Sequence, residues 1–350
     1  MKYLTEKVRK ITPYTAGIQP NEPGWIKLNT NENPYPPSPK VAEALKRTDI
    51  SSLRLYSDFN EKNLSQAIAK HLNVSAESIF CGNGSDEVLA HAYQAFFSGL
   101  DNVLVPDISY VFYPVWAQLF DVNKRIIPLD DHFSVNICDY KNGNGVIVAN
   151  PNAPTGKALS LCEVEQLVQN NPNGVVIIDE AYIDFAGVET AVPLVAKYEN
   201  LLVVRTFSKS HSLAGLRVGY AVGGELLIDG LNRVKSSFHP YALGQIEQEV
   251  AAAAIGDDGY WNETRQKIIA TRDRTIAGLR EMGYRVRDSH TNFLFMKAKT
   301  EDDARRLYEH LLENKILIRY WQKPRISEYL RVSIGTDTEM EAFLQCVKQF

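Results

Sequence analysis

The stretch Leu201-Leu202-Val203-Val204-Arg205-Thr206-Phe207-Ser208-Lys209 decides how the remaining sequence is interpreted. Its first four residues are all apolar, which predicts a short strand that is buried on both faces. The polar residues that follow place Lys209 just beyond this strand. Because ligands of open α/β sheets collect at the carboxyl ends of the strands, Lys209 is a candidate for binding or chemistry.

Other short apolar runs resemble this strand, and amphipathic stretches such as 161–168 separate them. The runs lie at 79–81, 103–105, 146–148 and 175–178. Strands that alternate with helices in this way are typical of an α/β fold, in which a mostly parallel sheet has helices on both faces.

The sequence changes character near residue 260, where a long charged helix is predicted at 261–282. Shorter elements follow it, at 284–287, 293–296, 302–313, 316–319 and 330–334. This α+β pattern predicts a small domain at 256–350 after a large domain at 41–255. Residues 1–40 are rich in Pro and Asn, which predicts an extended arm, and we expect the arm to contribute to the small domain.

The bulk composition argues against several classes of protein. Hydrophobic residues make up 45% of the 350 residues and charged residues 23%, as in ordinary globular chains, and the net charge is −4. The sequence has no long basic block, so we expect no nucleic-acid partner. No apolar run approaches the ~20 residues that cross a bilayer, so we expect no membrane association.

Cysteine and histidine are arranged without a metal-binding pattern. The four cysteines lack C-x-x-C spacing, which favours unpaired thiols in a reducing compartment. The seven histidines are too dispersed to form a ligand pair such as H-E-x-x-H, so we expect no metal. Residues 1–9 are charged and lack the apolar core of a signal peptide, and the expected location is therefore the cytoplasm.

A second reactive group follows the strand predicted at 175–178. Asp179 comes directly after this strand, and Tyr182 lies three residues further on. By itself, an aspartate in this position is often only a helix cap, and a lysine after a strand is usually a surface residue. Taken together, Asp179 and Lys209 place an acid and an amine at the same edge of the sheet.

With Arg217 downstream, the order of these residues resembles the signature of the fold-type I pyridoxal-phosphate aminotransferases. The resemblance covers nearly the whole chain, from 28–34 to 330–336. Within this superfamily, the sequence is most similar to the histidinol-phosphate aminotransferases, on the stretches Gly84-Ser85-Asp86-Glu87, Arg205-Thr206-Phe207-Ser208-Lys209 and Thr291-Asn292-Phe293. The resemblance implies an α/β large domain with a mostly parallel seven-stranded sheet flanked by helices, and a smaller α+β domain.

The resemblance also implies an activity, namely exchange of an amino group between L-histidinol phosphate and 2-oxoglutarate with pyridoxal 5'-phosphate as cofactor. Lys209 would form a Schiff base with the cofactor aldehyde, yield to the substrate amine, and then move a proton in a ping-pong reaction. Asp179 would keep the pyridine nitrogen protonated, so that the ring accepts electrons. Tyr182 would hydrogen-bond the phenolic oxygen O3′.

The cofactor phosphate needs hydrogen-bond donors. The turn Gly84-Ser85-Asp86 opens a predicted helix, where free N–H groups favour an anion. A Gly-rich turn alone is equally compatible with a tight turn and a helix cap. By resemblance, Gly84, Ser85 and Asp86 form the phosphate site together with Ser208 and Arg217.

The resemblance implies further contacts with the cofactor. Tyr110 matches the aromatic residue that stacks on the pyridine ring. Tyr56 matches a tyrosine that reaches the phosphate from the partner subunit, which implies a homodimer. The sequence departs from the family at Ala153, where an asparagine that contacts O3′ is common. Either Asn152 supplies this contact or Tyr182 holds O3′ with less help.

The implied partners are small molecules, an amino donor and a 2-oxo acid. One carries a phosphate and the other carboxylates, and guanidinium groups bind both kinds of anion with paired hydrogen bonds. Arg331 and Arg319 match the arginines of the family, although a strand-end arginine such as Arg319 is often only solvated. Asn33 and Tyr35 are candidates to close the site from the arm, but Pro-rich arms also serve as dimer straps.

Other activities remain as alternatives. A broad-specificity aromatic aminotransferase and a threonine-phosphate decarboxylase share these motifs. A nicotinamide dehydrogenase would need G-x-G-x-x-G, but Glu87 takes the place of the third glycine after Gly82-Asn83-Gly84. Non-catalytic regulators with this fold tend to lose the lysine, which this chain retains.

Overall fold

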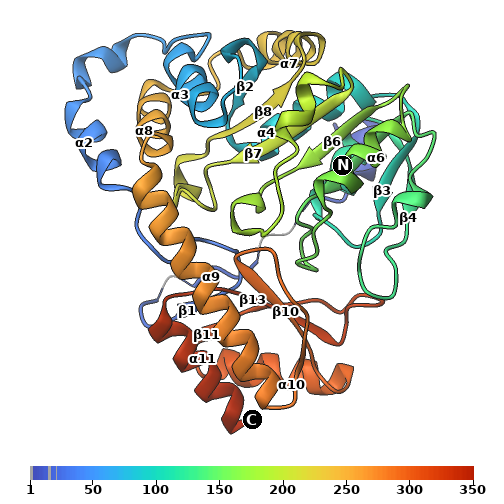
Figure 1. The fold of residues 1–350 in the computed structure, drawn as a ribbon, viewed down its shortest axis with the longest axis vertical. Coiled ribbons are helices and arrows are strands. Elements are labelled where there is room, and N and C mark those ends of the chain that lie inside the picture. The colour runs from blue at the N-terminus through green and yellow to red at the C-terminus, as the bar shows by residue number, and fades with distance from the viewer. Residues whose placement is uncertain (1–2, 15–16, 21) are drawn as a thin grey trace.

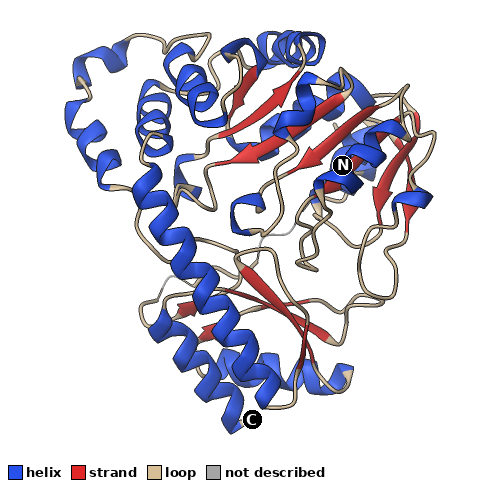
Figure 2. Cartoon of the chain, in the orientation of Figure 1, coloured by secondary structure: helices blue, strands red, loops and turns tan. Residues whose placement is uncertain are grey.

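The computed structural model describes residues 3–14, 17–20 and 22–350, so residues 1–2, 15–16 and 21 of the predicted arm lie outside it. Figure 1 shows a larger upper part built around a sheet and a smaller lower part. The long helix α9 (Asp258–Glu281) runs from the upper part into the lower one. In Figure 2, helices surround the strands of the upper part.

The sheet of the upper part consists of seven strands among the described residues. They are β2 (Ile79–Gly82), β3 (Asp101–Pro106), β4 (Asn123–Ile127), β5 (Gly145–Ala149), β6 (Val175–Asp179), β7 (Leu201–Thr206) and β8 (Gly219–Gly223). Their order across the sheet is β2-β8-β7-β6-β5-β3-β4. β8 runs antiparallel to β2 and β7, and the other pairs are parallel. The predicted mostly parallel, seven-stranded sheet is confirmed.

Both faces of this sheet are buried, because successive side chains of a strand point to opposite sides. In β5, Val146 and Val148 join a core on one face, whereas Ile147 joins a core on the other. The first face is covered by α2 (Pro39–Arg47), α3 (Lys62–Leu72), α6 (Leu161–Gln169) and α8 (Gln245–Ile255). The second face is covered by α4 (Gly84–Ala92), α5 (Phe112–Leu119) and α7 (Glu225–Phe238).

The lower part contains a small antiparallel sheet with the order β12-β13-β10-β9, formed by β9 (Arg285–Val286), β10 (Phe293–Lys297), β12 (Arg319–Tyr320) and β13 (Tyr329–Ser333). A separate parallel pair joins β1 (Ile26–Lys27) to β11 (Ile316–Leu317), so residues near the N-terminus extend the lower part. Its apolar core also includes residues of α9, α10 (Glu301–Glu313) and α11 (Asp337–Gln349). A short helix, α1 (Glu6–Lys10), precedes β1.

Some elements differ from the sequence-based expectation. The apolar spacing of residues 58–72 predicts a helix that starts near Asp58, but α3 begins at Lys62. The Asp58 carboxylate instead accepts hydrogen bonds from the backbone N–H groups of Asn60 and Lys62 at 3.1 and 3.0 Å. β4 was not predicted, since it is an edge strand in which only Ile127 is buried. β8 was not predicted either, because glycines occupy both of its ends.

β2, β3, β5, β6 and β7 run in the same direction, so their carboxyl ends lie along one edge of the sheet. The residues that follow these ends are therefore brought together, although they are far apart in the sequence. Within the described residues, no helix is both long and apolar enough to cross a membrane.

Candidate active site

Lys209 lies in the turn that follows β7, three residues beyond its last residue, Thr206. Its Nζ is 3.4 Å from the carbonyl oxygen of Thr30 and 5.6 Å from the ring centre of Tyr182. The described residues give this amine no carboxylate partner within ion-pair distance, and it lines a cavity. A lysine held in this way has its amine free to react with a bound molecule.

Asp179 is the last residue of β6 and is buried. Tyr113 Oη donates a hydrogen bond to Asp179 Oδ2 at 2.7 Å, and the backbone N–H of Ala181 donates to Oδ1 at 3.2 Å. Burial raises the pKa of Asp179 from 3.8 to about 6, although these two hydrogen bonds act in the opposite direction. A buried carboxylate with so few donors is suited to hold a cationic N–H group of a ligand.

The turn between β2 and α4 makes a close approach to Arg217. Gly84 has a φ of +79°, and a Cβ atom at this position would lie 2.4 Å from Arg217 Nη2. Arg217 Nη2 is 3.1 Å from Asp86 Oδ2, and Arg217 itself has a φ of +59°. Because the first N–H groups of a helix have no partner within it, the start of α4 and the guanidinium together can bind a phosphate.

Tyr110 lies beside Asp86 of this turn, and both residues line the cavity. Its hydroxyl donates a hydrogen bond to Asp86 Oδ1 at 2.7 Å, and its ring packs among the aromatic residues of α5. Burial, followed by the charge of Asp86, raises the pKa of Tyr110, so its hydroxyl stays protonated. The ring is therefore held in place by its hydroxyl, which suits a stacking role.

These side chains enclose a cavity of about 260 Å³. Among the residues that line it are Ser85, Asp86, Tyr110, Asp179, Tyr182, Ser208, Lys209 and Arg217. A larger hollow of about 660 Å³ shares Tyr110, Tyr182 and Lys209 with this cavity and adds Arg319 and Arg331. The smaller space has the donors for a flat phosphorylated ring, and the larger one can admit a second molecule beside it.

Arg319 and Arg331, which line the larger hollow, lack acidic partners among the described residues. Arg331 Nη2 donates to the carbonyl oxygen of Asn29 at 2.6 Å, and no described atom accepts a hydrogen bond from its Nε. Burial, assisted by the nearby Arg319, lowers the pKa of Arg331 to about 10. The ring centre of Trp321 lies 5.4 Å from Arg319 Cζ and 5.3 Å from Arg331 Cζ. The pair thus forms a positive site suited to an anionic group.

Besides Gly84, which shapes the turn before α4, four of the predicted residues line neither the cavity nor the larger hollow of this chain. Asn152 is buried, and its amide bonds only to neighbouring loops, through Ile108, Thr155 and Ser109, while Ala153 lines the cavity instead. Asn33 Nδ2 donates to the carbonyl oxygens of Lys209 and Ser210, at 3.0 and 3.3 Å. Tyr35 packs against the core of the lower part.

Tyr56 is the fourth of these residues. It is 83% exposed and stacks on Tyr241 at a ring distance of 4.6 Å, outside the cavity of its own chain. This position leaves it available to another molecule.

Three residues of the site were not singled out from the sequence. Tyr113 of α5 holds Asp179, and a tyrosine only three residues after the predicted site residue Tyr110 was a usable signal. Asn31 Nδ2 donates to Tyr182 Oη at 2.9 Å. Thr30 contacts Lys209 through its backbone carbonyl oxygen. Because every residue has such an oxygen, the pattern of side chains could not predict this contact.

The comparisons with known proteins agree with this geometry. The family model of class I and II aminotransferases matches residues 23–347. The chain therefore belongs to the class I and II aminotransferases. The family and the fold predicted from the sequence are thus confirmed, and so is the dependence on pyridoxal phosphate.

Particular relatives narrow the comparison. The chain is 48% identical over 347 residues to a histidinol-phosphate aminotransferase of Brachyspira hyodysenteriae, covering 99% of this chain and 98% of the relative. It is 47% identical over 353 residues to one of Acinetobacter baumannii, covering 100% and 97%. The crystal structure of a histidinol-phosphate aminotransferase from Sinorhizobium meliloti in complex with pyridoxal-5'-phosphate is similar, with a TM-score of 0.88 and 22% identity, covering 100% and 98%.

Proposed function

We propose that this protein transfers an amino group between L-histidinol phosphate and 2-oxoglutarate. The observation that carries the proposal is the sequence identity of 47–48% with histidinol-phosphate aminotransferases over nearly the full length of the chain. The larger hollow supports it independently, because Arg319 and Arg331 offer two guanidinium groups to the phosphate of one substrate or the carboxylate of the other.

The residues of the smaller cavity fit the cofactor. Ser85, Ser208 and Arg217 would be the donors for its phosphate, and Ser85 lies at the start of α4, where an anion is favoured. Tyr110 would lie against one face of the ring, and Tyr182 and Asp179 would hold its phenolic oxygen and its nitrogen. When bound, the cofactor supplies an electron sink for the bond that is broken at the substrate carbon.

The proton movements of the reaction are assigned to the chain itself. Lys209 Nζ takes the proton from the substrate carbon that bears the amino group, and it returns a proton in the second half of the cycle. This amine can perform both steps because no ion pair with a described residue ties it down. A cationic ring nitrogen held against Asp179 would lower the pKa of this carboxyl from its raised value, so Asp179 would stay ionised.

Arg319 and Arg331, which line the larger hollow together with Lys209, would bind the anionic group of the substrate. Arg331 Nε has no hydrogen-bond partner among the described residues, and the pKa of Arg331 is lowered to about 10. A bound phosphate or carboxylate would accept a hydrogen bond from Nε and raise this pKa. Arg319 and Arg331 are directly paired across β12 and β13, so their side chains leave the same face of the sheet, and Trp321 lies near both guanidinium groups. A single site of this kind accepts the two different substrates of a ping-pong reaction in turn.

We further propose that the protein acts as a homodimer in the cytoplasm. Ile50, Leu53, Leu55 and Tyr56 form an exposed apolar surface, with 80, 48, 60 and 83% of their area accessible. Such a surface marks an interaction site, and a second copy would bring Tyr56 to the partner's phosphate site. Free thiols at Cys81, Cys138, Cys162 and Cys346 are typical of a reducing compartment.

An amino-donor panel tests the proposed function. Initial rates are measured with 2-oxoglutarate and L-histidinol phosphate, L-phenylalanine or L-threonine phosphate. We expect the highest kcat/KM with L-histidinol phosphate. A higher value with phenylalanine would favour an aromatic aminotransferase, and release of carbon dioxide from threonine phosphate would favour a decarboxylase.

A further inference from the structure

Two segments of the chain carry the acid and the amine of the site, and a buried carboxylate joins them. Asp184 lies in the turn Ile183–Phe185, which directly follows Tyr182. Its Oδ2 accepts a hydrogen bond from Ser210 Oγ at 2.5 Å, and Ser210 is the residue next to Lys209. Its Oδ1 accepts a hydrogen bond from Arg205 Nη2, at the end of β7. Asp184 thus bonds to residues on both sides of Lys209.

This contact is shielded from water. The Arg205 and Asp184 side chains are 8 and 16% accessible, and Ser210 is 2% accessible. Burial alone would raise the pKa of Asp184, but the charge of Arg205 holds it below its usual range, so the carboxylate is ionised. Charge-assisted hydrogen bonds in a buried setting fix geometry more firmly than exposed ones.

The Lys209 turn is also held from its other side. Asn33 Nδ2 donates to the backbone carbonyl oxygens of Lys209 and Ser210 at 3.0 and 3.3 Å. The backbone of this turn is therefore fixed between Asn33 and Asp184, while the Lys209 amine keeps only its contact of 3.4 Å to Thr30. A fixed backbone holds the Lys209 amine in the same place in every catalytic cycle, and the side chain remains free to react.

We propose that Asp184 is a positioning residue that acts through Ser210, setting the place of Lys209 relative to Asp179 and Tyr182. The inference rests on the proposed cofactor chemistry of Lys209 but not on the identity of the substrate. Asp184 does not line the cavity, so its effect reaches the reacting atoms only through the Lys209 turn.

Pyridoxal phosphate and pyridoxamine phosphate together distinguish a change in the position of Lys209 from a change in cofactor affinity. Pyridoxal phosphate reports the position of Lys209, because the amine adds to the aldehyde carbon and one water is lost as the carbon–nitrogen double bond forms. Borohydride then donates a hydride to that bond and makes the link permanent. Pyridoxamine phosphate lacks the aldehyde, so its affinity reports the phosphate and ring contacts alone.

The experiment compares wild type, Ser210→Ala and Asp184→Asn as full-length proteins freed of cofactor. Samples with saturating pyridoxal phosphate are quenched with borohydride at set times, and the labelled Lys209 peptide is quantified by mass spectrometry. We expect capture to be slower by about tenfold or more in both variants. We expect the affinity for pyridoxamine phosphate to change less than about twofold.

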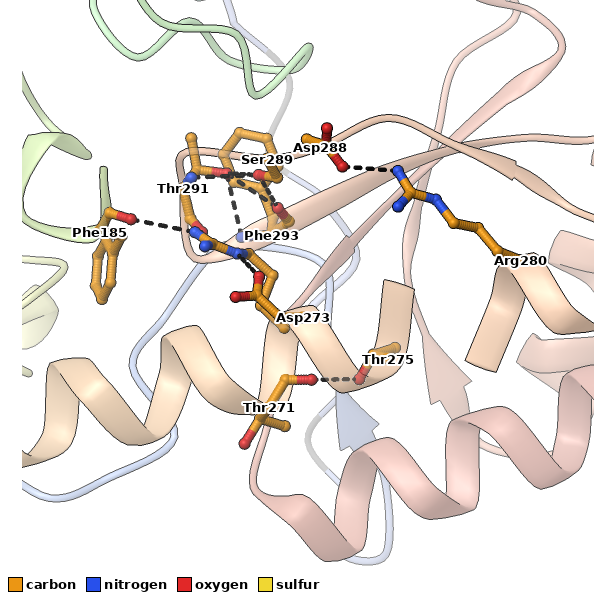
Figure 3. A network of polar contacts seen from close by, with 10 residues as sticks. Phe185, Thr271, Asp273, Thr275, Arg280, Asp288, Ser289, Thr291 and Phe293 are labelled. Atoms are coloured by element: carbon orange, nitrogen blue, oxygen red, sulfur yellow. Dashed lines mark hydrogen bonds and ion pairs between the residues drawn. The ribbon is translucent and has the colours of Figure 1, made fainter. Parts of the chain in front are cut away.

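Ser289→Ala is the matched control, because Ser289 is also a buried serine that donates a hydrogen bond, here to the carbonyl oxygen of Phe293 in the lower part (Figure 3). It should capture pyridoxal phosphate like wild type. Capture at the wild-type rate by Ser210→Ala would overturn the proposal, and so would an equal loss of pyridoxamine phosphate affinity. If Asp184→Asn does not fold, Ser210→Ala alone decides. Failure of wild type to capture pyridoxal phosphate would instead contradict the proposed function.

Discussion

At the scale of single residues, Asp179 is a buried carboxyl group whose ionised form lowers the stability of the folded protein. Its pKa is raised by burial to about 6, so the folded protein binds this proton more tightly than the unfolded chain does. The stability that depends on this proton is therefore fully present below about pH 4 and is lost as the pH rises to about 6, where the folded protein releases the proton. Groups of this kind are typical of functional sites.

Asp179→Asn should separate stability from activity. Without cofactor, the variant should be more stable than wild type by about 1–3 kcal/mol at pH 7.5, because the buried charge is removed. The difference should vanish near pH 4, and kcat should fall by about 100-fold or more. Urea unfolding at several pH values checks the first part. A stability difference that is the same at pH 4 and pH 7.5 would contradict this account.

Tyr113→Phe should make Asp179 harder to ionise. Loss of the hydrogen bond at 2.7 Å removes a contact that lowers the pKa of Asp179, so that pKa should rise further. Pyridoxamine phosphate affinity, measured against pH, should then reach its plateau at a higher pH. Tyr140→Phe is the matched control, since Tyr140 is buried but its hydroxyl has no hydrogen-bond partner among the described residues. An equal pH shift in both variants would reject the role of Tyr113.

Lys209, Asp179 and the residues of the phosphate turn could be predicted because each follows an apolar strand, and the ends of parallel strands meet. Asn33 and Asn152 were harder to place, since the sequence shows that an amide is present but not which loop it bonds. The hydrogen bond from Asn31 to Tyr182 joins residues that are distant in sequence, so no local pattern could reveal it.

At the scale of elements, the turn into α4 is shaped by a glycine that leaves room for Arg217. Gly84→Ala and Gly99→Ala should both lose about 1 kcal/mol of stability, because both glycines have positive φ values, +79° and +73°. Only a Cβ at Gly84 would displace Arg217, since nothing lies within 4 Å of one at Gly99. We expect the Kd for pyridoxal phosphate, measured by fluorescence titration, to rise about tenfold in Gly84→Ala alone. Equal Kd values would contradict the phosphate site.

The strands and helices were predicted most successfully where the spacing of apolar residues along the sequence matches the burial of their side chains. The apolar runs of β5, β6 and β7 are buried on both faces and were recognisable, whereas exposed β4 and glycine-bounded β8 were not. Helix starts were less certain. The side chain of Asp58 caps a turn ahead of α3, and this role depends on two hydrogen bonds that the helical spacing does not announce.

At the scale of the whole molecule, the lower part is tied to the upper part close to the site. Arg272 of α9 donates from Nη1 to the carbonyl oxygens of Phe185 and Thr291, at 3.1 and 3.0 Å, and so links the turn that contains Asp184 to the lower part. Figure 3 labels Phe185 and Thr291, whose carbonyl oxygens accept these two hydrogen bonds. The sequence predicted two parts but gave no sign of this link, because it uses backbone oxygens.

A shared site in a homodimer predicts complementation between two defective subunits. Lys209→Ala lacks the amine, and Tyr56→Ala lacks the side chain proposed to reach the partner. A heterodimer of the two variants would contain one site with both residues intact, so its activity should exceed that of either homodimer. Co-expressed subunits with different tags allow the heterodimer to be purified and assayed. Activity no higher than that of the Tyr56→Ala homodimer would contradict a shared site.

The proposed function requires Lys209 to transfer the proton when L-histidinol phosphate donates its amino group. The most direct measurement is the absorbance of protein loaded with pyridoxal phosphate after L-histidinol phosphate is added without 2-oxoglutarate. Wild type should convert one equivalent of cofactor per site to pyridoxamine phosphate, and Lys209→Ala should convert none on the same timescale. No conversion in wild type, or conversion by Lys209→Ala at the wild-type rate, would contradict the account.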